Sequence, residues 1–144
     1  NLKHYPMKYF SIAEFLRSDA AEKYQVSNIP SDEELLKVLN NINALVNNVL
    51  DPLRAMIARP IIITSGYRSQ RVNELVGGSK TSQHLLGKAA DIHVQGYTPQ
   101  QMDMVYRTIQ MYYDFDQLIF YPSKNIIHIS WNGDKNRQES WVKA

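Results

Sequence analysis

The feature that most constrains the fold is a long apolar stripe in the first half of the chain. Its members recur at steps of three and four residues: Leu35, Leu36, Leu39, Ile42, Leu45, Val46, Val49, Leu50, Leu53, Met56 and Ile57. This spacing predicts a long amphipathic helix that buries one side in a core. Ser31 precedes an acidic first turn and is the expected N-cap. Pro52 is expected to kink the helix or to divide it in two.

Four stretches after this helix are rich in β-branched and aromatic residues and predict strands. They span residues 61–64, 89–94, 116–121 and 126–131. The last two flank a turn at 122–125 and are expected to form a hairpin. Shorter helices are predicted after the capping residue Ser11, at 70–76 and after Thr98, which is followed by a proline at the favoured first position. The polar tail at 132–144 contains no residue pattern that indicates a catalytic or binding role.

Length and composition limit the classes of function that the chain can have. The 144 residues, 44% of them hydrophobic and 21% charged, are expected to form one globular domain over 1–144. A net charge of +2 without a long Lys/Arg run argues against nucleic-acid binding. No apolar run approaches the roughly 18 residues of a membrane span, and we expect a monomer. Since the chain has no cysteine, any transition-metal site must be built from His, Asp and Glu.

One segment concentrates the chemically informative residues. Residues 82–93 read SQHLLGKAADIH and place His84 before Asp91. A second imidazole, His128, follows far downstream in the run NIIHIS, where strand alternation turns it away from its apolar neighbours on either side. Two imidazoles and one carboxylate suit Zn²⁺ and leave a fourth coordination position open, as catalytic zinc sites do. We therefore predict that His84, Asp91 and His128 bind zinc.

These residues resemble the signature of the zinc D-alanyl-D-alanine carboxypeptidases and murein endopeptidases, within the wider group that includes hedgehog-type domains. The signature has the form S-x-H-x-x-G-x-A-x-D, followed later by a strand with a central His. It is matched by Ser82, His84, Gly87, Ala89, Asp91 and His128. The segments SGYRS, GGS, FDQLI and IHIS extend the resemblance, and FSIAEFLRSDAA extends it more weakly. The resemblance implies an α+β fold in which helices pack on one face of a small, mainly antiparallel sheet, with a single zinc on the other face.

The same resemblance implies an activity. It implies a zinc metallopeptidase that cleaves an amide bond of the peptidoglycan stem peptide, as a D-Ala-D-Ala carboxypeptidase or an L,D-endopeptidase. This substrate favours a periplasmic or extracellular protein, or a phage-derived lysis protein, and a chain that opens NLKHYP without an initiator Met is compatible with a removed leader. Two alternatives stay open. One is a catalytically weakened relative that retains the zinc site and binds the wall or a partner, and the other is a structural domain whose histidines fill the core.

The sequence departs from the family at the general base. The resemblance implies a Glu or Asp three residues before the second His or at the end of the preceding strand, and these positions hold Asn125 and Tyr121. An amide does not accept a proton at neutral pH, and a phenol, whose pKa is ordinarily about 10, is a poor base. Asp116, Asp114 and His93 are the substitutes. His93 alternates onto the metal-binding face of its strand, where it is also a candidate for an additional ligand.

Substrate contacts are expected from side chains around the metal. Arg68 follows the first strand in the segment SGYRS, and its planar guanidinium suits a substrate carboxylate or a developing oxyanion, so we assign it both binding and catalysis. Ser82, two residues before His84, is expected to donate a hydrogen bond to the substrate. Tyr121 and Asn125 are the remaining predicted substrate contacts.

Overall fold

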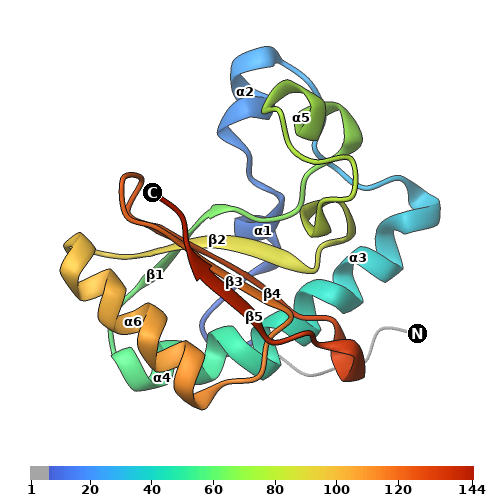
Figure 1. The fold of residues 1–144 in the computed structure, drawn as a ribbon. Coiled ribbons are helices and arrows are strands. Elements are labelled where there is room, and N and C mark those ends of the chain that lie inside the picture. Colours follow the sequence, from blue (N-terminus) through green and yellow to red (C-terminus); the bar gives the residue numbers. More distant parts are fainter. Residues whose placement is uncertain (1–6) are drawn as a thin grey trace.

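The computed structural model describes residues 7–144 and contains both helices and strands (Figure 1). The α-helices are α1 (Ile12–Leu16), α2 (Asp19–Tyr24), α3 (Asp32–Leu45), α4 (Asp51–Ile57), α5 (Gln70–Leu75) and α6 (Pro99–Tyr112). Single turns of other helix types are η1 (Val46–Leu50), η2 (Gln83–Leu86) and η3 (Gly133–Lys135). The strands are β1 (Ile61–Ser65), β2 (Ala89–Val94), β3 (Gln117–Tyr121), β4 (Ile126–Ser130) and β5 (Glu139–Val142). Within this described range, no helix combines the length and apolarity needed to cross a lipid bilayer.

The long apolar stripe forms a helical rod made of α3, η1 and α4. The wider π-helical turn η1 stands immediately before α4, whose second residue is Pro52. Proline has no N–H to bond to the preceding turn, and the π turn carries the chain past this gap. Pro52 therefore divides the predicted helix in two without ending the rod. Its inner side chains are buried: Val38, Ile42, Leu45, Val46, Val49, Leu50 and Leu53.

The five strands form one sheet in the order β1-β2-β4-β3-β5. The pairs β1–β2, β2–β4 and β3–β4 are antiparallel, whereas β5 runs parallel to β3 at the edge. β3 and β4 form the predicted hairpin, and its turn contains Asn125 in the left-handed region with φ of 55°. The α+β class with a mainly antiparallel sheet is therefore confirmed.

The two faces of the sheet have opposite chemical character. Strand alternation sends one set of side chains into the core formed with the helical rod and α6. This buried set includes Ala90, Ile92, Leu118, Phe120, Ile127 and Ile129. Side chains that alternate with this buried set along β2, β3 and β4 point to the opposite face. They are Asp91, His93, Tyr121 and His128. The residues singled out for chemistry thus share the face that the rod and α6 leave uncovered.

Two elements go beyond the sequence predictions. Helix α2 follows α1 closely, and the Ser18 side chain caps it by accepting a hydrogen bond from the Ala21 N–H at 3.1 Å. β5 lies in the tail that carries no chemical signal, where four largely exposed residues give no apolar alternation. This strand forms because it pairs with β3, which local sequence does not reveal.

Candidate metal centre

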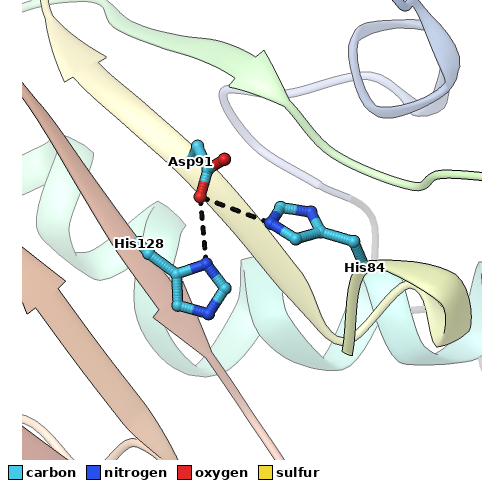
Figure 2. A group of neighbouring side chains, drawn as sticks. All are labelled: His84, Asp91 and His128. Carbon is cyan, nitrogen blue, oxygen red and sulfur yellow. Dashed lines mark hydrogen bonds and ion pairs between the residues drawn. The ribbon is translucent and has the colours of Figure 1, made fainter. Parts of the chain in front are cut away.

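The three predicted ligands converge on the face of the sheet opposite the rod (Figure 2). Asp91 on β2 and His128 on β4 are direct partners in the antiparallel register. His84 reaches them from η2, the 3₁₀ turn that leads into β2. One ligand atom from each residue lies within 4.8 Å of the other two, and residues 7–144 contain no second group of this kind. The structure therefore brings together the residues that the sequence predicted.

The Asp91 carboxylate stands at the centre of the group. Its Oδ1 lies 3.3 Å from His84 Nε2 and 3.0 Å from His128 Nδ1. The second ring nitrogen of His84, Nδ1, lies 2.7 Å from the carbonyl oxygen of Gly66. Because a carbonyl only accepts, Nδ1 carries the proton and Nε2 presents its lone pair to the group. His84 is thus held in the tautomer that a metal ligand requires.

The spacing of the donor atoms fits Zn²⁺. Atoms at about 2.0–2.1 Å from a tetrahedral zinc lie about 3.4 Å from one another. The separations of 3.3 and 3.0 Å around Asp91 Oδ1 are close to this value. Two imidazole nitrogens and one carboxylate oxygen fill three of the four positions of a catalytic zinc site. The donor set and its spacing therefore suit the ion that the sequence predicted.

Asp91 is in the charged form that a metal binds. Burial of its carboxyl opposes ionisation, but the hydrogen bond with His128 and the neighbouring His84 imidazole outweigh burial and hold the pKa of Asp91 well below its usual range. The guanidinium of Arg68 adds a positive group, with Nη2 3.5 Å from Asp91 Oδ2. The carboxylate therefore needs no deprotonation at neutral pH before it binds a cation.

Arg68 is held beside the group by its guanidinium. Nε donates to Ser65 Oγ at 3.1 Å, Nη1 donates to Asn73 Oδ1 at 3.4 Å, and Nη2 faces Asp91. Burial lowers the pKa of Arg68, and the Asp91 carboxylate opposes this effect. The side chain is 18% exposed, so it is not fully enclosed by the protein. An arginine ordered in this way loses less entropy when it grips an anion.

Most of the chain matches a known protein family. Residues 8–130, a range that holds all three clustered ligands and Arg68, match the family described as Peptidase M15. The chain belongs to the M15 peptidase family. No match appears among curated proteins. M15 peptidases depend on a metal, and in this member the group of His84, Asp91 and His128 is the one that offers a metal site among the described residues.

The signature segment of this M15 peptidase takes its shape from local backbone requirements. Ser82 Oγ accepts a hydrogen bond from the His84 N–H at 3.2 Å and so caps η2. Gly87 ends η2 with φ of 74°, and a Cβ at this position would lie 2.9 Å from the carbonyl oxygen of Val38 on α3. Only glycine satisfies both conditions without strain. Ser82 therefore orients η2 through its hydroxyl oxygen, and this bond does not use the hydroxyl hydrogen.

His93 lies beside the metal group and is not a member of it, so the additional-ligand option is not supported. Its Nδ1 lies 2.9 Å from the carbonyl oxygen of Asn125. Nδ1 therefore donates, and Nε2 presents a lone pair. The Asn125 side chain, predicted to contact substrate, instead donates from Nδ2 to the carbonyl oxygen of Tyr97 at 2.8 Å. Asn125 thus supports the hairpin turn that orients His93.

Tyr121 ends β3 on the same face as His128. Burial raises the pKa of its phenol, the Asp91 carboxylate raises it further, and Arg68 lowers it in part. The hydroxyl is therefore protonated at neutral pH. In this M15 peptidase Tyr121 does not replace the missing carboxylate as a base, but its hydroxyl suits the predicted role of substrate contact.

The structure does not support the sequence prediction of Asp116 as general base. Its carboxylate accepts hydrogen bonds from the Arg137 backbone N–H at 2.8 Å, from Arg137 Nε at 3.0 Å and Nη2 at 2.9 Å, and from Gln83 Nε2 at 2.7 Å. These bonds, those from the Arg137 side chain foremost, lower the pKa of Asp116. Both oxygens of this fully buried residue are engaged in structural contacts. Asp114 is exposed in the segment before β3.

Several residues that support the site went unrecognised in the sequence. Gly66 accepts the His84 Nδ1–H, while Ser65 and Asn73 hold Arg68. Ser65 and Gly66 fall within SGYRS, and their position at the end of β1 could have indicated that they lie at the site. Nothing in the sequence indicated Asn73, because it lies on a short helix and reaches Arg68 only in the folded chain.

Proposed function

We propose that this M15 peptidase is a zinc metallopeptidase that cleaves an amide bond in the stem peptide of peptidoglycan. The observation that carries the proposal is the convergence of His84 Nε2, Asp91 Oδ1 and His128 Nδ1 in a member of a peptidase family. Cleavage as a D-Ala-D-Ala carboxypeptidase and as an L,D-endopeptidase both fall within it. A wall substrate places the action in the periplasm, outside the cell or in phage-driven lysis.

The ligands have separate tasks in this proposal. His84, Asp91 and His128 would hold Zn²⁺, which when bound lowers the pKa of water from 15.7 to about 7 and polarises a carbonyl group. Asp91 Oδ1 contacts both imidazoles and so brings the three donor atoms together. The Gly66 carbonyl keeps the proton of His84 on the side away from the group. The chain itself thus sets the tautomer of His84 and the direction in which its Nε2 faces the group.

Arg68 and Tyr121 are the proposed substrate contacts. The Arg68 guanidinium is ordered beside Asp91 and offers a fork of donors for a carboxylate or a developing oxyanion. Tyr121 shares its face of the sheet and keeps a protonated hydroxyl. Both groups donate, which matches the excess of acceptor oxygens in a peptide that ends in a carboxylate. Ser82 adds a third donor near His84.

His93 is the proposed acceptor of the proton from the attacking water. It shares a strand face with Asp91, and its Nε2 lone pair is fixed by the donation of Nδ1 to Asn125. An imidazole accepts protons at neutral pH, unlike the Asn125 amide or the protonated Tyr121 phenol. With Asp116 engaged by Arg137 and Asp114 exposed in the segment before β3, His93 is the remaining one of the three predicted substitutes.

Wall binding without cleavage is a second candidate function, and one observation favours it. Tyr121 stands where the family resemblance implies a carboxylate, and its pKa is raised. Purified muropeptides incubated with the protein, with and without added Zn²⁺, separate the two functions. Zinc-dependent release of a shortened stem peptide would support the peptidase. Zinc binding and muropeptide binding without any product would overturn cleavage and leave the binding function.

Replacing Arg68 is expected to lower turnover strongly. Loss of one preorganised donor to a developing oxyanion costs about 10²–10³ in kcat. Arg68→Lys keeps the charge but loses the fork, so its kcat should fall almost as far as that of Arg68→Ala. Arg71→Ala is the matched control, because Arg71 forms an exposed ion pair with Glu74 on α5. Muropeptide kinetics measure the effect, and wild-type turnover in Arg68→Ala would refute the role.

A further inference from the structure

The tail after β4 packs closely on the domain although it lies outside the family match at 8–130. β5 pairs with β3, and the residues just before it are bound to the segment that enters β3. The Gln138 N–H donates to the Phe115 carbonyl oxygen at 3.1 Å, and the Glu139 N–H donates to the Asp116 carbonyl oxygen at 3.0 Å. These contacts fix the backbone that follows Arg137 against the backbone of Phe115 and Asp116.

Within this region Gln83, Asp116 and Arg137 form a connected set, here named the Asp116 clamp. Arg137 engages both carboxylate oxygens through Nε and Nη2, and its backbone N–H adds a third bond. Gln83 Nε2 donates to Asp116 Oδ2 at 2.7 Å. Asp116 is fully buried, so its charge is compensated by these donors and not by water. The clamp joins the tail to η2.

The attachment of η2 matters because it carries His84. Asp91 and His128 are fixed by the ladder between β2 and β4, whereas His84 comes from a turn of four residues. Gln83 precedes His84, and its Oε1 is buried without a hydrogen-bond partner among the described residues. The orientation of the Gln83 amide is therefore set by its bond to Asp116. One side of η2 is held by this bond, and the His84 ring is held by Gly66.

We propose that the Asp116 clamp positions His84 for metal binding, so that a tail outside the family match sets the affinity of the site. Gln83, Asp116 and Arg137 are positioning residues here, since none of them belongs to the metal group. The inference rests on the proposed function in one respect, namely that the metal is zinc. The inference gives a role to the buried carboxylate of Asp116, which takes no part in the proposed catalysis.

Zinc titration of the metal-free protein by competition calorimetry tests this assignment. Gln83→Ala should weaken zinc affinity about tenfold, the lower end of the 10–100-fold cost of losing a residue that orients a ligand. The visible spectrum of the Co²⁺-loaded variant should also change, because the position of His84 alters the ligand field. The matched control is Gln110→Ala, which removes a 2.8 Å bond from α6 to Ser140 on β5 without touching Asp116. Its zinc affinity should equal that of the wild type.

A second variant separates positioning from general stability. Arg137→Lys loses the two-point grip on Asp116 and should weaken zinc affinity in the same direction as Gln83→Ala. The free energy of unfolding, measured without metal, shows which variants are folded during the titration. Wild-type zinc affinity and Co²⁺ spectra in folded Gln83→Ala and Arg137→Lys would overturn the inference. Failure of the wild type to bind zinc would overturn the proposed function, and with it this inference.

Discussion

Asp91→Ala is expected to abolish zinc binding and, with it, peptidase activity, while the domain stays folded. Asp91 supplies one ligand oxygen, and its Oδ1 pairs with both His84 and His128. Its loss removes the single negative charge of the site and leaves Arg68 facing the two imidazoles. The zinc dissociation constant should rise well beyond the 10–100-fold that follows the loss of a residue that merely orients a ligand. Calorimetric zinc titration measures the change.

The fold should survive this substitution because Asp91 faces away from the core formed by the helical rod and the sheet. Circular dichroism and thermal unfolding of the metal-free variant check this point. Asp103→Ala is the matched control, since Asp103 forms an ion pair with Arg107 on α6. It should bind zinc as the wild type does. Undiminished zinc affinity in Asp91→Ala would disprove the proposed ligand set.

His93→Ala is expected to cost about 10²–10⁴ in kcat and to leave zinc affinity unchanged, as removal of a general base does. His93 lies on the face that carries Asp91, and Asn125 holds its Nδ1 so that Nε2 is the accepting nitrogen. His93→Gln should be equally slow, because an amide does not take up a proton at neutral pH. Muropeptide kinetics and zinc titration on the same preparations measure the two effects. A simultaneous loss of zinc affinity would indicate a ligand and contradict the base role.

The converse substitution, Tyr121→Glu, restores a carboxylate at the end of β3. A large gain in muropeptide cleavage over a nearly silent wild type would show that the natural protein lacks an effective base and favour the binding function. A fast wild type with no gain in the variant would support His93. Asn125→Asp is the poorer test of the same idea, because it would place a carboxylate 2.8 Å from the carbonyl oxygen of Tyr97. The structure therefore selects Tyr121 as the position to change.

The sequence by itself determined the secondary structure of most of the chain and the identity of the clustered residues. The apolar stripe of the rod, the Thr98 cap of α6 and the β3–β4 hairpin depend on contacts between near neighbours. The structure confirms them, except that Leu36 and Met56 of the stripe are exposed. His84, Asp91 and His128 were found because residue type and strand alternation are readable locally. The strand β5 was not predicted, because its short, exposed sequence has no local strand pattern and it forms only by pairing with β3.

Only the tertiary structure decided which polar groups are engaged. Asp116 is a candidate base by residue type alone. In the fold, its oxygens accept hydrogen bonds from Arg137, 21 residues away, and from Gln83, 33 residues away. The tautomer of His84 likewise depends on Gly66, 18 residues earlier in the chain. A carboxylate or an imidazole has the same intrinsic chemistry wherever it stands in a sequence. Its protonation and availability follow from burial and from hydrogen-bond partners that only the folded register of strands and turns brings within reach.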